Sequence, residues 1–257
     1  MIFLFIYAII ILCATFLGAF VGLGGGVIIK PLLDLIGHDT IDTVNFISAC
    51  AVFSMSISSI IKHIKAKTKI DYKLIFTVSA GAVIGGICGA SLFSHMLNIF
   101  DNTIMKNIQG IILGILLILS VIYINLKNKK SFTVKNHAGI LLTGLVLGFI
   151  ASFLGVGGGP INVAFLVLFF SMSVKESAVY SVGIIFFSQL SKLITVSVSH
   201  TVPQFEPTVI IAAVACAVLG GLLGVKANKK FDEKIVKTVF TIVVSAIAVI
   251  NLYNGIV

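Results

Sequence analysis

The chain has 257 residues, of which 58% are hydrophobic and 11% are charged, and its mean hydropathy is +1.17. A soluble domain is about half apolar and about a quarter charged, so this composition excludes an ordinary soluble enzyme. Apolar runs of about 20 residues recur along the whole length, and each is long enough to cross a bilayer as a helix. The short alternating strands of a membrane barrel are absent. The sequence therefore predicts an all-α polytopic membrane protein.

Ten apolar runs follow one another along the chain. They cover residues 2–21, 26–37, 42–61, 73–95, 104–126, 137–154, 159–172, 176–198, 207–226 and 236–254. The first run lacks the basic start of a secretory signal and is interpreted as a retained helix. The second and seventh runs are short, because about a dozen helical residues cover only half to two thirds of the hydrocarbon core.

The net charge is +9, and every one of the 18 basic residues is a lysine. These lysines cluster in short loops between apolar runs, which is typical of a topology signal and not of nucleic-acid binding. The four cysteines each fall inside an apolar run and form no CxxC or Cys/His cluster. Neither a disulfide nor a metal site is predicted, and no cofactor is expected.

The two halves of the chain match each other in three blocks that occur in the same order. The paired blocks are 19–28 with 152–161, 71–90 with 206–225, and 100–108 with 231–239. Such repeats are typical of transporters. The predicted organisation is a first membrane repeat over 1–126, a cytoplasmic linker over 127–136 and a second membrane repeat over 137–257.

Loop lysines indicate how the repeats are oriented. Loops 62–73, 127–135 and 226–237 are rich in lysine, whereas 199–206, the partner of the first, has none. Placing the three Lys-rich loops on the cytoplasmic side satisfies the positive-inside rule only if the short runs also count as crossings. Each repeat then has five segments, the second is inverted, and both termini lie outside. Re-entrant short segments would instead make the repeats parallel and put one Lys-rich loop on the wrong side.

A glycine triplet stands before each short run, in "GLGGG" (22–26) and "GVGGG" (155–159). Glycine allows tight turns and lets another group approach its N–H donors. A helix that starts there presents free N–H groups and a positive dipole end, which bind anions without a cationic side chain. The predicted substrate-binding residues of this kind are Gly24, Gly25, Gly26, Gly157, Gly158 and Gly159.

Close helix packing is the alternative role for these glycines. The GGxxG runs at 85–89 and 220–224 are interpreted as such packing seams. For the triplets we favour a binding role, because packing alone does not predict a short run after each of them. Pro160 directly follows the second triplet, where proline suits the first helical turn.

Polar side chains are concentrated in the third run of each repeat and beside the second triplet. Ser54, which the repeat alignment pairs with Ser188, and Gln189 are candidates for a polar path, although serine hydroxyls often bond their own backbone. Asn162 can donate its amide to an oxyanion. Lys30 either attracts an anion or snorkels, and Lys192 is expected at the membrane interface.

Together, "GAFVGLGGGVIIKPLL" (18–33) and "GFIASFLGVGGGPINVAFL" (148–166), each followed by a Ser-rich run, resemble the sulfite exporter TauE/SafE family of permeases. Pro31 matches the proline that this family places a few residues after the triplet. In the second repeat Pro160 comes immediately instead, and position 165 is Phe. The resemblance implies bacterial inner-membrane transport of sulfur-containing anions such as sulfite or sulfonates.

The sequence thus predicts a secondary transporter for a small anion, embedded in the lipid bilayer. A passive anion channel and a non-transporting scaffold or assembly factor are the alternatives. An enzyme is not expected, because the apolar runs offer no Ser/His, paired Asp or HExxH arrangement. No nucleic-acid partner is expected, and whether the chain forms a homo-oligomer is left open.

Overall fold

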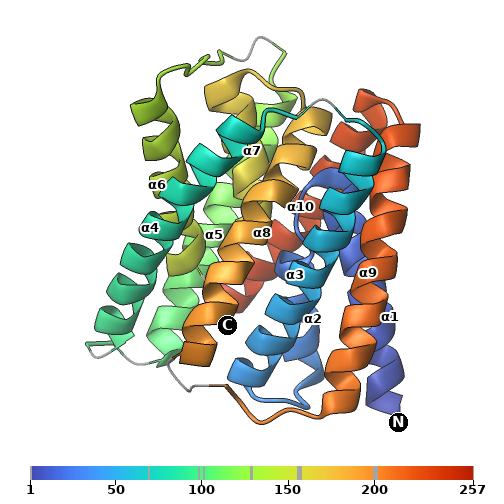
Figure 1. Ribbon diagram of the computed structural model, residues 1–257. Coiled ribbons are helices and arrows are strands. Elements are labelled where there is room, and N and C mark those ends of the chain that lie inside the picture. Colours follow the sequence, from blue (N-terminus) through green and yellow to red (C-terminus); the bar gives the residue numbers. More distant parts are fainter. Residues whose placement is uncertain are drawn as a thin grey trace.

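The computed structural model describes residues 2–68, 70–97, 99–100, 102–127, 130–154, 158–198 and 202–256. The described residues form a bundle of helices without strands (Figure 1). In chain order the helices are α1 (Ile2–Val21), α2 (Gly26–Ile36), α3 (Ile41–Lys65), α4 (Tyr72–Leu97), α5 (Asn102–Asn125), α6 (His137–Phe153), α7 (Gly159–Phe170), α8 (Val174–Val198), α9 (Pro207–Lys230) and α10 (Glu233–Ile256). The predicted all-α fold is confirmed, with one helix for each predicted run.

Seven of these helices are long and apolar enough to cross a membrane, namely α1, α3, α4, α5, α8, α9 and α10. Helices α6 and α7 are shorter apolar helices. The two helices that begin at the glycine triplets are the shortest, with 11 residues in α2 and 12 in α7. The chain is therefore a multi-pass membrane protein, and its two short helices stand where the sequence predicts them.

The connections that contain the Lys-rich loops and the two chain termini lie toward opposite ends of the bundle, as the lysine pattern predicts. The connections that follow α3, α5 and α9 lie at one end, and both chain termini lie toward the other end (Figure 1). The three Lys-rich loops can therefore face the same side of a membrane. This arrangement favours an inverted second repeat, which stays a prediction, as do the repeat boundaries and the outward orientation of the termini.

Two helix pairs connect the halves of the chain. Helix α4 packs mainly along α6, and α9 packs mainly along α1. Added methyl groups at Gly85 and Gly148 would overlap the carbonyl oxygens of Leu145 and Ala82, so the α4 and α6 backbones are in direct contact. Small residues allow this approach, and in lipid such close packing replaces the hydrophobic effect as a force between helices.

The α9–α1 pair is built in the same way. A methyl group at Gly224 would overlap the carbonyl oxygen of Phe16, and the buried amide of Asn228 donates to the carbonyl oxygen of Phe20 at 2.8 Å. The predicted GGxxG seams are thus confirmed at Gly85 and Gly224. In both pairs, the fourth helix of one half is held against the first helix of the other half.

Between these pairs, α3 packs against α8. The rings of Phe53 and Phe186 stack there with centroids 5.3 Å apart. Helices α7 and α8 each begin the same number of residues after α2 and α3, and this register pairs Phe53 with Phe186 and Ser58 with Ser191. It differs by one residue from the register that pairs Ser54 with Ser188.

The glycine seam leads to a stability prediction. Gly148→Val should lower the Tm of the detergent-purified protein by at least about 5 °C, because the larger side chain must separate α6 from the backbone of α4. Gly37→Asn is the control, since no atom lies within 4 Å of the added Cβ and asparagine tolerates the positive φ of 66° there. Equal melting curves for the two variants would contradict the assigned role of the seam.

Candidate functional site

Both short helices begin at equivalent positions of the two glycine motifs. Gly25 precedes α2 with φ of 76°, and Gly158 precedes α7 with φ of 82°. These left-handed conformations favour glycine, and neither helix start is capped by a side chain. Gly24 has φ of 77°, and Gly26 and Gly159 are the first residues of their helices.

The prolines lie as the motif suggests. Pro160 falls within the first two positions of α7, where its missing N–H breaks no helical hydrogen bond, and Pro31 lies inside α2. Gly157 lies outside the described residues. The remaining triplet residues therefore start two short helices whose first N–H groups have no side-chain cap, as an anion site of the predicted kind requires.

The two glycine motifs touch each other. A methyl group on Gly159 would overlap the carbonyl oxygen of Leu23, so the start of α7 rests on the backbone of the first motif. The Ser181 hydroxyl on α8 donates to the carbonyl oxygen of Gly22 at 2.7 Å and lies 3.4 Å from that of Gly159. Segments far apart in the sequence are thus joined at one buried point by glycines and a single serine.

Asn162 lies in the first turn of α7 and is 3% exposed. Its backbone N–H donates to the carbonyl oxygen of Gly158 at 2.7 Å. Its side-chain amide is close to the helix start, since Oδ1 lies 2.8 Å and Nδ2 lies 3.2 Å from the position of a Cβ on Gly158. The structure therefore places this buried amide beside the N-terminus of α7, where its N–H₂ group can act as an anion donor.

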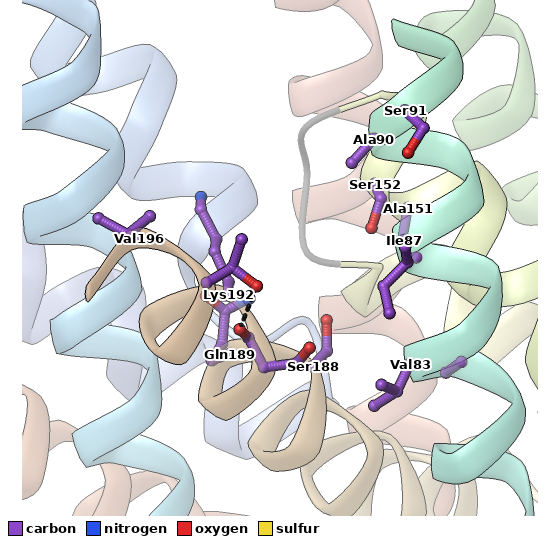
Figure 2. A pocket seen from close by; sticks show the side chains of 14 residues that line it. Val83, Ile87, Ala90, Ser91, Ala151, Ser152, Ser188, Gln189, Lys192 and Val196 are labelled. Carbon is purple, nitrogen blue, oxygen red and sulfur yellow. Dashed lines mark hydrogen bonds between the residues drawn. The ribbon is translucent and has the colours of Figure 1, made fainter. Parts of the chain in front are cut away.

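A cavity of about 620 Å³ lies between α4, α6 and α8 (Figure 2). Its described lining consists of Ala82, Val83, Gly86, Ile87, Ala90, Ser91, Ala151, Ser152, Ser188, Gln189, Ser191, Lys192, Thr195 and Val196. Figure 2 shows the α4 side chains on one wall and Ser188, Gln189 and Lys192 on the facing wall. The cavity is lined by small and branched apolar side chains, hydroxyl groups, one amide and one ammonium group.

The cavity approaches the second glycine motif at Ala151. This residue lines the cavity, and its Cβ lies 3.2 Å from the position of a Cβ on Gly158. The α7 N-terminus is thus separated from the cavity by a single small side chain. None of the described triplet glycines lines the cavity itself.

Of the three residues predicted to form a polar path, the structure places two in the cavity. Ser188 and Gln189 line the cavity, whereas Ser54 donates to its own backbone at the carbonyl oxygen of Cys50, at 2.8 Å. Sequence reasoning missed Lys192, because its place near the end of an apolar run suggested the membrane interface. It lies one turn after Ser188 and Gln189, and this helical spacing could have revealed it.

Lys192 is the one charged side chain among the described lining residues. Its positive charge can attract an anion into the cavity.

A helical membrane bundle with a partly polar cavity between its helices is an architecture that polytopic membrane permeases share. The family model described as sulfite exporter TauE/SafE matches residues 7–250. The chain therefore belongs to the TauE/SafE family.

Two relatives are similar over most of their length. A protein named "Probable membrane transporter protein YunE" from Bacillus subtilis is 29% identical over 276 aligned positions, which cover 95% of this chain and 96% of that protein. A protein named "Probable membrane transporter protein MJ0441" from Methanocaldococcus jannaschii is 29% identical over 235 positions, covering 85% and 84%. Both names describe membrane transporters and specify no substrate.

The serine that joins the two motifs can be tested directly. Ser181→Ala should destabilise the protein by about 1–3 kcal/mol, because the buried carbonyl oxygen of Gly22 loses its donor. Ser120→Ala is the control, since this hydroxyl bonds only the carbonyl oxygen of Leu116 within its own helix. Denaturation in detergent should separate the two variants, and indistinguishable stabilities would show that Ser181 is not needed to join the motifs.

Proposed function

We propose that this protein is a secondary transporter that moves a small sulfur-containing anion, such as sulfite or a sulfonate, across the cell membrane. The anion enters the cavity between α4, α6 and α8 and is bound next to the paired N-termini of α2 and α7. One observation carries this proposal: the cavity that holds Lys192 ends one small side chain from the α7 N-terminus. Family membership supports the class of protein.

The residues fit the chemistry of an oxyanion. Lys192 supplies a positive charge, and the hydroxyl groups of Ser188, Ser191 and Ser152 supply neutral donors that replace water around the anion. Deeper in, the uncapped N–H groups of α7 and the Asn162 amide supply further donors, and the helix dipole adds favourable potential. Weak, distributed donors suit a transporter, because the anion must also leave.

In this proposal the first triplet completes the site from the opposite side. Gly24 packs against Ile185, which lies one turn before Ser188 and Gln189 on α8. Helix α2 thereby brings its N-terminus toward the same stretch of α8. Gly25 and Gly26 would act through backbone N–H groups, as Gly157, Gly158 and Gly159 would in the second motif. The N–H of Gly24 already donates to the carbonyl oxygen of Gly18 at 3.3 Å, so Gly24 would shape the turn.

Transport itself is tested in proteoliposomes that contain the purified protein alone. Uptake should be measured for sulfite, thiosulfate, sulfate, sulfonates and chloride, with and without a pH gradient. The proposal expects saturable flux of at least one sulfur-containing anion. Flux that never saturates would indicate a passive channel, and no movement of any anion would contradict transport.

Lys192→Gln should raise the KM for the transported anion about tenfold or more, because a charge-assisted hydrogen bond contributes about 1.5–3 kcal/mol. Lys175→Gln is the matched control on the same helix, since that ammonium group bonds the carbonyl oxygen of Phe231 on the exposed surface. An unchanged KM in Lys192→Gln would place the anion outside the cavity.

The glycine half of the site has its own test. Asn162→Leu keeps the volume of the side chain and removes its donor, so anion affinity should fall about fivefold to tenfold. Titration calorimetry of purified protein with the best anion of the panel measures this directly. If affinity stays unchanged in Asn162→Leu while Lys192→Gln weakens it, the anion is held in the cavity without the α7 N-terminus.

A further inference from the structure

The cavity separates two helices whose repeat counterparts are in contact. Gly86 on α4 corresponds to Gly221 on α9 in the aligned blocks, and the helix starts pair Ser191 and Lys192 on α8 with Ser58 and Ser59 on α3. The α4–α8 gap and the α9–α3 contact are therefore two versions of the same interface. We call them the α4–α8 gate and the α3–α9 gate.

The α3–α9 gate is closed. A methyl group on the buried Gly221 would overlap the Ser58 hydroxyl and lie 2.9 Å from the carbonyl oxygen of Met55 and 3.0 Å from the Ser59 hydroxyl. Ser58 is 7% exposed and Ser59 is fully buried. No space remains between the two helices at this level.

The α4–α8 gate is open at the corresponding level. A methyl group on Gly86 would meet only α6 atoms, the Ser152 hydroxyl at 2.9 Å and the carbonyl oxygen of Gly148 at 3.8 Å being the nearest. Gly86 lines the cavity, and Lys192 stands on the facing wall (Figure 2). The two halves thus share one design but differ in whether the interface is closed.

In each gate, one helix is packed tightly against a neighbour outside the gate. Glycine seams hold α4 against α6 and α9 against α1, so a gate opens when one of these pairs shifts against α3 or α8. At the other end of the α4–α8 gate the helices still touch, with the rings of Phe76 and Phe187 5.3 Å apart and Ile75 against Gly183. That contact can serve as a pivot.

One hydroxyl in the closed gate points to a second state. Ser59 is fully buried, and its Oγ has no hydrogen-bond partner. A buried hydroxyl without a partner destabilises the protein. If the α3–α9 gate opens during the cycle, this hydroxyl can gain water or an anion as a partner.

We propose that the α4–α8 and α3–α9 gates open alternately, and that this structure is the state open at α4–α8. In the other state, Gly86 closes against Ser191 and Lys192, while Gly221 separates from Ser58 and Ser59. The inference rests on the proposed transport function and identifies the moving interfaces of that cycle. The α4–α8 cavity lies toward the C-terminal ends of its helices, away from the Lys-rich loops, and the α3–α9 gate lies toward those loops.

Two equivalent glycine substitutions should act in opposite directions. Gly221→Ala inserts a methyl group into the closed gate and disfavours this state. Gly86→Ala adds one beside the Ser152 hydroxyl at the cavity lining, where that side chain must shift, and disfavours closure of the α4–α8 gate. A substitution shifts such an equilibrium only by its differential effect on the two states. The matched pair therefore separates gating from a general loss of packing.

The rate at which a reagent labels a single introduced cysteine shows whether the gate around that cysteine is open. In a background where Cys13, Cys50, Cys88 and Cys216 are replaced by serine, Ser191→Cys probes one gate and Ser59→Cys the other. Labelling rates with a membrane-impermeant methanethiosulfonate are compared in right-side-out spheroplasts and in inverted vesicles. Without further change, the Ser191→Cys probe should react at least about tenfold faster than Ser59→Cys.

Gly221→Ala should lower the ratio of Ser191→Cys to Ser59→Cys labelling by about fivefold or more, and Gly86→Ala should leave it unchanged or raise it. If Gly221→Ala increases Ser59→Cys labelling without slowing Ser191→Cys, the gates open independently and the proposal is overturned. Equal effects of both glycine variants would overturn it as well.

A second variant covers the case in which Gly221→Ala does not fold. Gly86→Leu adds a large side chain beside Ser152 at the cavity lining and should hold the α4–α8 gate open, so flux is lost while Ser191→Cys is still labelled and Ser59→Cys stays protected. Full flux in Gly86→Leu would refute alternation at these gates. Absence of flux in the unsubstituted protein would instead refute the proposed function, so the two failures are distinguishable.

Discussion

The contact of glycine backbone with carbonyl oxygen is the constraint on which this structure depends. It occurs where α7 rests on Leu23, where α4 meets α6, and where α9 meets α1. In a bilayer the apolar side chains gain little by leaving lipid for protein, so close packing and internal hydrogen bonds hold helices together. A single methyl group at Gly85, Gly148 or Gly159 would remove that contact, and no neighbouring side chain can make room because the neighbour is backbone.

The same contacts create the region where function is proposed. Two short helices can start inside the bundle only if their unpaired N–H groups and the preceding turns are accommodated, since unsatisfied backbone is strongly disfavoured away from water. Glycine supplies the positive φ values at Gly25 and Gly158, and Ser181 supplies a donor for the turn at Gly22. Lys192 lines the cavity whose wall at Ala151 adjoins Gly158.

Comparison of the two halves shows that equivalent glycines have different surroundings. Gly86 and Gly221 are equivalent in sequence, yet one lines the cavity and the other is closed against Ser58 and Ser59. The GGxxG pattern alone does not decide this difference, because both helices carry it. The facing helices differ, with Lys192 on α8 where α3 has Ser59, and the α4–α6 and α1–α9 pairs stand differently relative to α8 and α3.

The sequence by itself determined the helices, the two short segments and their glycine starts. Hydropathy, helix-breaking glycines and the matching blocks can all be read without knowing how the helices pack. It also indicated Ser188, Gln189 and Asn162 as polar groups near a site. Only the tertiary structure decided that Ser54 bonds its own backbone, that Lys192 lines the cavity and that the glycine motifs touch. Those outcomes depend on the rotation and separation of helices distant in the chain, which single-residue patterns do not encode.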